Sequence, residues 1–171
     1  QPATADGSLL IFPNVAAMIA STSPDIIQGI NIITQGYHVS GDGGGGTYIV
    51  EAAQPVDGFG DHDLNGGDAA ILQGASATPL SYGAKGDGTT DDSASFQALS
   101  AAKLSITVPD RTYLITSKID IRSDQSWTME NPLLIQDGIT FTSIFEASDV
   151  FGWAVLGRTR CRGSLVTSAD I

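Results

Sequence analysis

Three arginines alternate with small residues near the end of the sequence, in the stretch Arg158-Thr159-Arg160-Cys161-Arg162. In a β-strand this alternation puts the three guanidinium groups on one face and Thr159 and Cys161 on the other. Arginine binds carboxylates through paired hydrogen bonds, so Arg158, Arg160 and Arg162 are candidate contacts for uronates or other acidic sugars. The alternative, which we favour, is a solvated face or salt bridges between chains. Cys161, the single cysteine, is expected to point inward as a small apolar residue.

A calcium-loop pattern, Asp-x-Asp-x-Asn-Gly, occupies residues 61–66. Calcium takes about six to eight oxygen ligands, and such loops normally close with a bidentate glutamate at the twelfth position. That position is Leu72 in this chain. We therefore expect a plain turn here and no bound metal.

The glycine run Gly41 to Gly46 formally contains Gly-x-Gly-x-x-Gly. In a dinucleotide site this motif must open a helix whose N-terminus holds the pyrophosphate. The residues that follow, Thr47 to Val50, predict a strand instead. We expect a structural turn in which glycines allow positive φ angles and close backbone approach, with no nucleotide or other cofactor.

Three acidic residues, Asp87, Asp91 and Asp92, precede a predicted helix. A pair of carboxylates would suit acid–base cleavage of a glycosidic bond. We favour a structural interpretation, in which Asp87 forms a turn and Thr90, Asp91 or Asp92 caps the helix. Negative charge at that end also complements the helix dipole.

The two histidines, His38 and His62, lie in separate glycine-rich loops, and their spacing suggests no Ser/His/Asp arrangement. We expect both to be turn residues. Several aromatic side chains could stack on sugar rings, but we favour a place in the core or in contacts between chains, because large apolar residues are usually buried. These aromatic residues are Trp127, Phe141, Phe145, Phe151 and Trp153.

The 171-residue chain is strongly acidic, with 8 basic and 19 acidic residues and a net charge of −11. Nucleic acid and anionic membrane surfaces are poor partners for it, because phosphate binding needs concentrated Lys and Arg. Apolar runs such as Leu9 to Phe12 are too short to cross a bilayer, so no membrane insertion is expected. The sequence starts at Gln1 rather than Met, which we interpret as a trimmed N-terminus.

The part of the chain up to about residue 77 predicts a small β-rich domain with one helix. Asn14 is a suitable N-cap for a short helix over residues 15–20. A Gly/Asp loop occupies residues 57–68. The strands expected in this part lie at residues 30–34, 47–51 and 69–72.

Residues 75–79 predict a linker or neck, and a helix with Phe96, Leu99 and Ala102 on one face follows. Beyond Lys103 we expect only short strands separated by turn residues. A sandwich and a solenoid both fit this pattern, and strand spacing alone does not choose between them. The expected strands lie at residues 104–108, 113–121, 126–129, 133–136, 139–145 and 151–156.

Two motifs bear on this choice. Residues 82–92 read Tyr-Gly-Ala-Lys-Gly-Asp-Gly-Thr-Thr-Asp-Asp, and residues 96–99 read Phe-Gln-Ala-Leu. Together they are similar to the entry motif of pectate-lyase-like right-handed β-helices, which occur in polygalacturonase relatives and phage depolymerases. There the glycine turn leads into a helix that caps the solenoid. Residues 106–115 resemble that family's first rung, although the family often has glycine where Asp110 and Arg111 stand.

The second motif covers residues 35–48, with further matches at 57–60 and 64–72. It looks like the small N-terminal domain that precedes the β-helix in phage tailspikes, and residues 12–20 fit the helix that begins such domains. Secreted plant and fungal pectinases do not usually carry this block. The order of the two motifs therefore favours the tailspike family.

The resemblance implies a mainly β fold in three parts. A small N-terminal β-rich domain with a short helix would occupy residues 1–77, and a neck with a capping helix residues 78–103. Residues 104–171 would form the first rungs of a right-handed parallel β-helix, which we expect to be truncated.

The same resemblance implies a homotrimer on the virion. The N-terminal domain would dock to a phage tail or baseplate protein, and the β-helix would face bacterial capsular or O-antigen polysaccharide. The full-length protein would be a polysaccharide depolymerase, either hydrolase or lyase. Its catalytic carboxylates usually lie beyond the first rungs, so no catalytic residue is carried over onto this chain, and we expect this part alone to be inactive.

Two other functions stay open. A secreted pectinase-like lyase or hydrolase, not associated with a virion, would be a monomer with a signal peptide upstream of Gln1. A non-enzymatic adhesion module would depend on calcium binding at residues 61–66.

Overall fold

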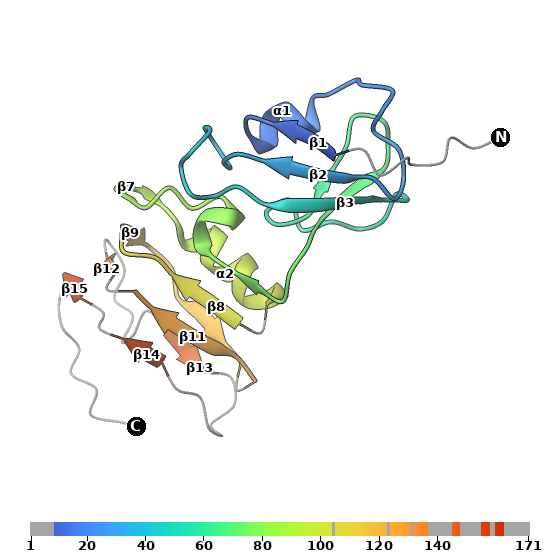
Figure 1. Ribbon diagram of the computed structural model, residues 1–171. Helices are drawn as coiled ribbons and strands as arrows, with labels where there is room; N and C mark the ends of the chain where they lie inside the picture. Colours follow the sequence, from blue (N-terminus) through green and yellow to red (C-terminus); the bar gives the residue numbers. More distant parts are fainter. Residues whose placement is uncertain are drawn as a thin grey trace. The chain divides into compact units, whose positions relative to one another are not determined.

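The computed structural model describes residues 9–103, 105–122, 124–130, 132–136, 145–147, 155–157 and 160–162. The fold is mixed and strand-rich, with two α-helices and a short 3-10 helix among these residues. The chain divides into two compact units (Figure 1). Unit 1 comprises Gln1–Gly74 and Leu80–Gly83, and unit 2 comprises Ala75–Pro79 and Ala84–Ile171. No helix among the described residues is long and apolar enough to cross a membrane.

Unit 1 is built on a five-stranded sheet of order β1-β2-β3-β5-β4. The β1–β2 pair is parallel, and the other pairs are antiparallel. The expected strands at 30–34, 47–51 and 69–72 are confirmed to within one residue. The strands are β1 (Leu9–Phe12), β2 (Asn31–Thr34), β3 (Thr47–Glu51), β4 (His62–Asp63) and β5 (Ala69–Leu72).

Helix α1 (Val15–Ile19) begins at the predicted N-cap. The side chain of Asn14 accepts a hydrogen bond of 2.8 Å from the backbone N–H of Ala17, which satisfies one of the helix's free donors. The apolar run Leu9–Phe12 is strand β1, which the sequence analysis did not predict. It escaped prediction because all four residues are apolar, so the run has no alternating pattern.

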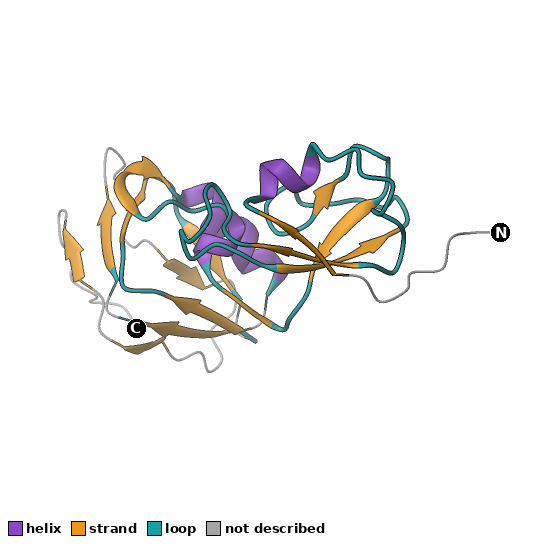
Figure 2. Ribbon diagram, turned by 45° about the horizontal axis from the view of Figure 1, so that its top comes forward, coloured by secondary structure: helices purple, strands orange, loops and turns teal. Residues whose placement is uncertain are grey.

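Burial in unit 1 follows the two-residue period of the strands. In β2 and β3 the buried positions alternate with exposed or half-buried ones. Met18 of α1 is fully buried with them, and Figure 2 shows α1 on one side of this sheet. The core of unit 1 includes Val15, Met18, Ile30, Ile32, Tyr48, Val50, Leu64, Ala70 and Leu72.

Unit 2 consists of helix α2 (Ser93–Ala102) and a set of parallel strands. Each strand from β8 to β12 pairs in parallel with the strand three places later in the chain. The sheets have the orders β14-β11-β8-β6, β15-β12-β9-β7 and β10-β13. The strands are β6 (Ser76–Ala77), β7 (Asp87–Asp91), β8 (Ser105–Val108), β9 (Thr112–Ile115), β10 (Ile119–Ile121), β11 (Ser126–Met129), β12 (Leu133–Gln136), β13 (Phe145–Ala147), β14 (Val155–Gly157) and β15 (Arg160–Arg162).

One expectation for unit 2 was wrong, and one strand was not predicted. Residues 113–121 form two strands, because the N–H groups of Thr116 and Ser117 bind the Ser93 hydroxyl instead of a neighbouring strand. The unpredicted strand is β7, which pairs irregularly with β9. The strands predicted at 139–145 and 151–156 lie partly outside the described residues.

The core of unit 2 lies between α2 and the parallel strands. Phe96 and Leu99 of α2 are fully buried, as expected, whereas Ala102 is exposed because it stands in the last turn. The strands contribute buried residues in alternation. These are Ile106, Val108, Tyr113, Ile115, Ile119, Ile121, Trp127 and Met129.

Candidate functional site

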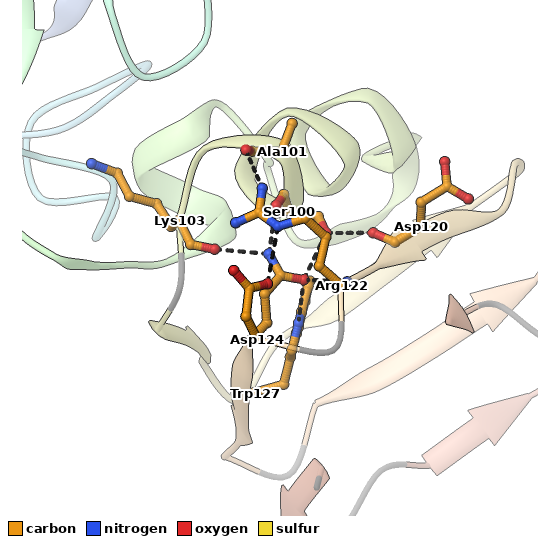
Figure 3. Close-up of polar contacts among 8 residues, drawn as sticks. Ser100, Ala101, Lys103, Asp120, Arg122, Asp124 and Trp127 are labelled. Atoms are coloured by element: carbon orange, nitrogen blue, oxygen red, sulfur yellow. Dashed lines mark hydrogen bonds and ion pairs between the residues drawn. The ribbon is translucent and has the colours of Figure 1, made fainter. Parts of the chain in front are cut away.

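The C-terminal end of α2 is held by the side chains of Ser100, Arg122 and Gln125, which we call the cap cluster. Figure 3 labels Ser100 and Arg122 of this cluster with the residues that they contact. The Gln125 amide nitrogen donates hydrogen bonds to the backbone carbonyls of Ser100 and, at 2.8 Å, Lys103. Gln125 is 5% exposed, so its amide acts in a largely dry environment. These bonds satisfy carbonyls that have no partner within the helix.

The other two members of the cap cluster link the helix end to the strands β10 and β11. Arg122 donates a hydrogen bond of 2.6 Å from Nη1 to the Ala101 carbonyl and pairs through Nε with Asp124 at 3.2 Å. The Ser100 hydroxyl donates to the carbonyl of Asp120. The cluster therefore fixes α2 against the β10–β11 connection.

The side-chain amide oxygen of Gln125, Oε1, makes the remaining contacts of the cap cluster. It accepts hydrogen bonds from the backbone N–H of Arg122 at 2.9 Å and from Nε1 of Trp127 at 3.4 Å. One side chain thus joins a helix end, a turn and a core aromatic residue. These hydrogen bonds hold a helix end and a turn in place, so the role of Gln125 is structural.

Sequence reasoning missed the cap cluster, although one signal was present. Helices commonly end at Gly or Asn, whose left-handed conformation satisfies the last carbonyls. Here the C-cap is Lys103 in an extended conformation. The missing glycine implies that another group binds those carbonyls, but nothing in the sequence points to Gln125, which stands more than 20 residues away.

The acidic trio before α2 has three separate structural roles. Asp87 forms a turn by accepting from the N–H groups of Thr89 at 2.9 Å and Thr90 at 2.7 Å, as predicted. Asp91 accepts from the N–H of Ser93 at 3.0 Å, in the first turn of α2. Capping by Asp91 is therefore confirmed, and capping by Thr90 was wrong because its hydroxyl binds Asp87 instead.

Asp92 occupies the N-cap position but makes no capping hydrogen bond, so that expectation was also wrong. Its carboxylate is 1% exposed and accepts from the N–H groups of Lys85 at 2.7 Å and Gly86 at 3.2 Å. The carboxylate oxygens of Asp92 therefore bind the glycine-rich turn before β7 instead of capping the helix. Burial raises the pKa of the Asp92 carboxyl, although these hydrogen bonds oppose the rise.

The glycine run at residues 41–46 is a structural turn, as predicted. Gly41 and Gly43 have φ angles of +84° and +88°, and strand β3 rather than a helix follows. The Asp42 carboxylate organises the loop. Burial opposes its ionisation, but four backbone hydrogen bonds lower the pKa of Asp42. The donors are the N–H groups of Tyr37 (3.0 Å), His38 (2.8 Å), Val39 (3.0 Å) and Gly44 (2.8 Å).

Carboxylates in the calcium-like loop and just before it accept hydrogen bonds from backbone N–H groups. Asp57 accepts from the N–H groups of Phe59, Gly60 and Asp61 at 2.8–2.9 Å. Asp61 accepts from the N–H of Leu72 at 2.8 Å, so it joins the loop to strand β5. In the part of the chain that the structure describes, no group of three or more His, Cys, Asp and Glu side chains is arranged to hold a metal ion.

The two histidines differ in their surroundings. His38 is exposed, and its Nε2 donates a hydrogen bond of 2.9 Å to the Gly83 carbonyl. His62 was expected in a turn but lies in strand β4 and is 3% exposed. The Tyr37 ring lies 5.0 Å from the His38 ring and 5.9 Å from the His62 ring. The burial of His62 was not predicted, because glycine and aspartate surround it in the sequence.

The candidate sugar-binding arginines fall largely outside the described side chains. Arg158 lies outside the described residues. Arg160 and Arg162 belong to β15, whose backbone pairs in parallel with β12. Cys161 lies in the same strand and pairs with Leu134. Contact of these arginines with a sugar stays a prediction.

The aromatic residues are described in part. Trp127 is 1% exposed, and its ring stacks on Phe96 with centroids 6.4 Å apart, so its place in the core is confirmed. Phe145 lies in β13, of which the backbone is described. The remaining candidates, Phe141, Phe151 and Trp153, lie outside the described residues.

Comparison with solved structures shows a fold like that of phage tailspike proteins. The tailspike protein of Acinetobacter baumannii phage AM24 matches with a TM-score of 0.64 at 16% identity, over 81% of this chain and 27% of that one. Full-length tailspike protein 2 from an Escherichia coli O157:H7 bacteriophage matches with a TM-score of 0.61 at 17% identity, over 87% of this chain and 20% of that one. The enzymatically active domain of tailspike protein 4 from bacteriophage CBA120 gives 0.59 at 21% identity, over 79% and 19%.

The chain thus spans about a fifth to a quarter of the length of these proteins. A match over 79% of the chain is longer than either unit, so it includes residues of both. No family model matches the sequence. No curated protein sequence matches it either.

Proposed function

We propose that the chain is the N-terminal part of a phage tailspike, which mounts a trimeric, receptor-binding and polysaccharide-degrading β-helix on the virion for host attachment. The observation that carries this proposal is the succession of two unlike units. A mixed sheet with a short helix comes first, and α2 with parallel strands follows. The matches to tailspike structures extend over both units.

Unit 2 would be the beginning of a right-handed parallel β-helix. Three features support this. Every strand pair of unit 2 that the structure describes is parallel. Each strand from β8 to β12 pairs with the third strand after it, and helix α2 directly precedes these strands in the chain. In β10 the N–H of Asp120 donates to the side chain of Gln97 in α2 at 3.0 Å. The cap cluster would then seal the end of the solenoid, since an open end would leave apolar rungs in water.

Successive parts of the chain would have different roles. Residues 1–77 would dock to a tail or baseplate protein, residues 78–103 would form the neck and cap, and residues 104–171 would be the first rungs. The whole protein would be a homotrimer on the phage tail that acts outside the bacterium. The acidity of the chain suits an exposed, soluble surface.

Polysaccharide binding would fall to the β-helix. Arg158, Arg160 and Arg162 would bind acidic groups of a capsular or O-antigen glycan, supported by the place of β15 in a row of parallel strands. Cleavage by hydrolase or lyase chemistry would use residues outside this chain. The cap cluster, the acidic trio and the Asp42 loop are all engaged in holding the backbone.

Immunogold electron microscopy tests the mounting role. Antibodies raised against the 171-residue chain should label the tails of intact virions of the phage that encodes it. Antibodies that bind the purified chain but label no virion would contradict the proposal. The full-length gene product should also shorten host polysaccharide, measured by a fall in viscosity, whereas this chain alone should not.

A further inference from the structure

One face of the unit 1 sheet is apolar across four strands. Leu9 and Ile11 of β1 are 50% and 59% exposed, and Ile33, Ile49 and Ile71 on the same face are half-buried. We call these five residues the aliphatic stripe. Strand register places Ile11 beside Ile33 and Ile49 beside Ile71, so their side chains are neighbours. The buried core residues of β2 and β3 point to the opposite face.

This face is almost uncharged, although the chain carries a net charge of −11. Asn31 lies between Leu9 and Ile49 in this face, and Thr47 lies beside Ile33. Glu51 and Asp63, the acidic residues of this face, both pair with Ala69 at one end of it. Charged residues are typically depleted at the centre of a protein interface and confined to its margin.

The charge distribution selects the occupant. Two copies of a strongly acidic chain repel each other over most of their surface, and least where charge is missing. A basic partner would gain most from the acidic surface and little from the aliphatic stripe. The stripe is therefore better suited to a second copy of this chain than to a basic protein.

The position of β1 supports contact with another chain. β1 is the edge strand of its sheet and pairs with β2 alone among the described residues (Figure 1). Edge strands with exposed apolar side chains associate readily with other chains unless charge prevents it. The four residues of β1, Leu9–Phe12, carry no charge.

We infer that the aliphatic stripe is a self-association surface, through which unit 1 of one copy packs against unit 1 of another, with Leu9 and Ile11 at the centre of the contact. The inference rests on the proposed assembly of the protein from several copies. It adds the surface that the copies use.

Analytical ultracentrifugation of the 171-residue chain over a range of concentrations tests this inference. The wild-type chain should sediment as more than one copy, and Ile11→Glu should raise the dissociation constant at least about tenfold, as loss of a central interface residue does. Val39→Glu is the matched control, because Val39 is an aliphatic residue of unit 1 that is 62% exposed and lies outside the stripe. Circular dichroism should show both variants folded.

Salt dependence gives a second readout. Added sodium chloride should tighten the association, because it screens the repulsion between acidic copies and strengthens apolar contacts. A monomeric wild-type chain would overturn the inference and leave the face to another protein. Equal dissociation constants for wild type and Ile11→Glu would place the contact elsewhere. Either result is compatible with labelled virions, so it would not by itself refute the mounting role.

Discussion

The side-chain amide of Gln125 donates a hydrogen bond of 2.8 Å to the carbonyl of Lys103, the residue that ends α2. A residue of the β10–β11 turn therefore does what a C-capping glycine does in many helices. This arrangement couples the helix end to the strands, since the donor and the acceptor belong to different elements.

Replacement of Gln125 should destabilise unit 2 strongly. Gln125→Ala leaves the carbonyls of Ser100 and Lys103 and the indole N–H of Trp127 without this partner, and should cost about 2–3 kcal/mol of unfolding free energy. Gln125→Glu keeps the shape but turns a donor into an acceptor that faces two carbonyls, so it should cost at least as much. Urea unfolding followed by tryptophan fluorescence measures this, because both tryptophans belong to unit 2.

Gln97→Glu provides the control for that change. Gln97 uses its oxygen to accept from the N–H of Asp120 at 3.0 Å, and a glutamate retains such an oxygen. The same substitution should therefore be tolerated at residue 97 and damaging at residue 125. Similar urea midpoints for the two variants would show that the amide donors of Gln125 do not hold the helix.

The aromatic contact at the centre of unit 2 leads to a second prediction. Phe96 is fully buried between Tyr113, with centroids 5.1 Å apart, and Trp127, at 6.4 Å. Phe96→Ala should lower the unfolding free energy by about 3–5 kcal/mol, because it leaves a cavity and removes ring contacts. Phe96→Leu should recover a good part of this loss in the same fluorescence assay. A neutral Phe96→Ala variant would mean that α2 is not part of the core.

The sequence predicted those features of the fold that depend on local chemistry. Asn14 was recognisable as an N-cap because its role involves a backbone N–H only three residues away. The strands of both units were found to within a few residues where apolar and polar side chains alternate. The likeness to tailspikes rested on glycine and aspartate turns, whose conformations are also set locally.

The features that were missed depend on contacts distant in sequence. Asp92 was expected to cap α2, but its carboxylate binds the N–H groups of Lys85 and Gly86 instead. The sequence does not show which of these two hydrogen-bonding roles Asp92 takes. The break after Ile115 arises because Ser93 binds the next two N–H groups. Burial of His62 depends on Tyr37 and on strand pairing with Ala70.

The glycine run at residues 41–46 gives a third prediction, because its members are needed for different reasons. An added Cβ on Gly44 would overlap the Leu80 carbonyl oxygen and lie 2.7 Å from Cβ of Tyr37. At Gly41 a Cβ meets nothing within 4 Å, and only the φ of +84° is unfavourable. Gly44→Ala should therefore destabilise unit 1 by about 3 kcal/mol, and Gly41→Ala by about 1 kcal/mol.

Amide hydrogen exchange of β2 and β3 measures both glycine variants, since these strands form the centre of the unit 1 sheet. Faster exchange in Gly44→Ala than in Gly41→Ala is the expected order. The reverse order would mean that the positive φ at Gly41 matters more to unit 1 than the close packing at Gly44.

Burial of His62 makes the stability of unit 1 depend on pH. The ring is 3% exposed, its Nε2 has no hydrogen-bond partner, and burial lowers the pKa of His62 below its ordinary value of 6.5. The unfolded chain then binds a proton at a higher pH than the folded chain does. Stability is complete above pH 6.5 and decreases as the pH falls toward the folded-state pKa, by up to about 1.4 kcal/mol per pH unit.

His62→Phe should remove this dependence, because phenylalanine keeps a planar ring and cannot bind a proton. Exchange rates of β2 and β3 amides, corrected for intrinsic chemistry, should rise between about pH 7.5 and pH 5 in the wild type and stay flat in the variant. His38→Gln, which changes the exposed histidine, should retain the wild-type behaviour. A pH dependence that survived in His62→Phe would assign the effect to groups other than this imidazole. Loss of the pH dependence in His62→Phe alone would identify the buried imidazole as the group that must stay neutral for the unit 1 sheet to remain folded.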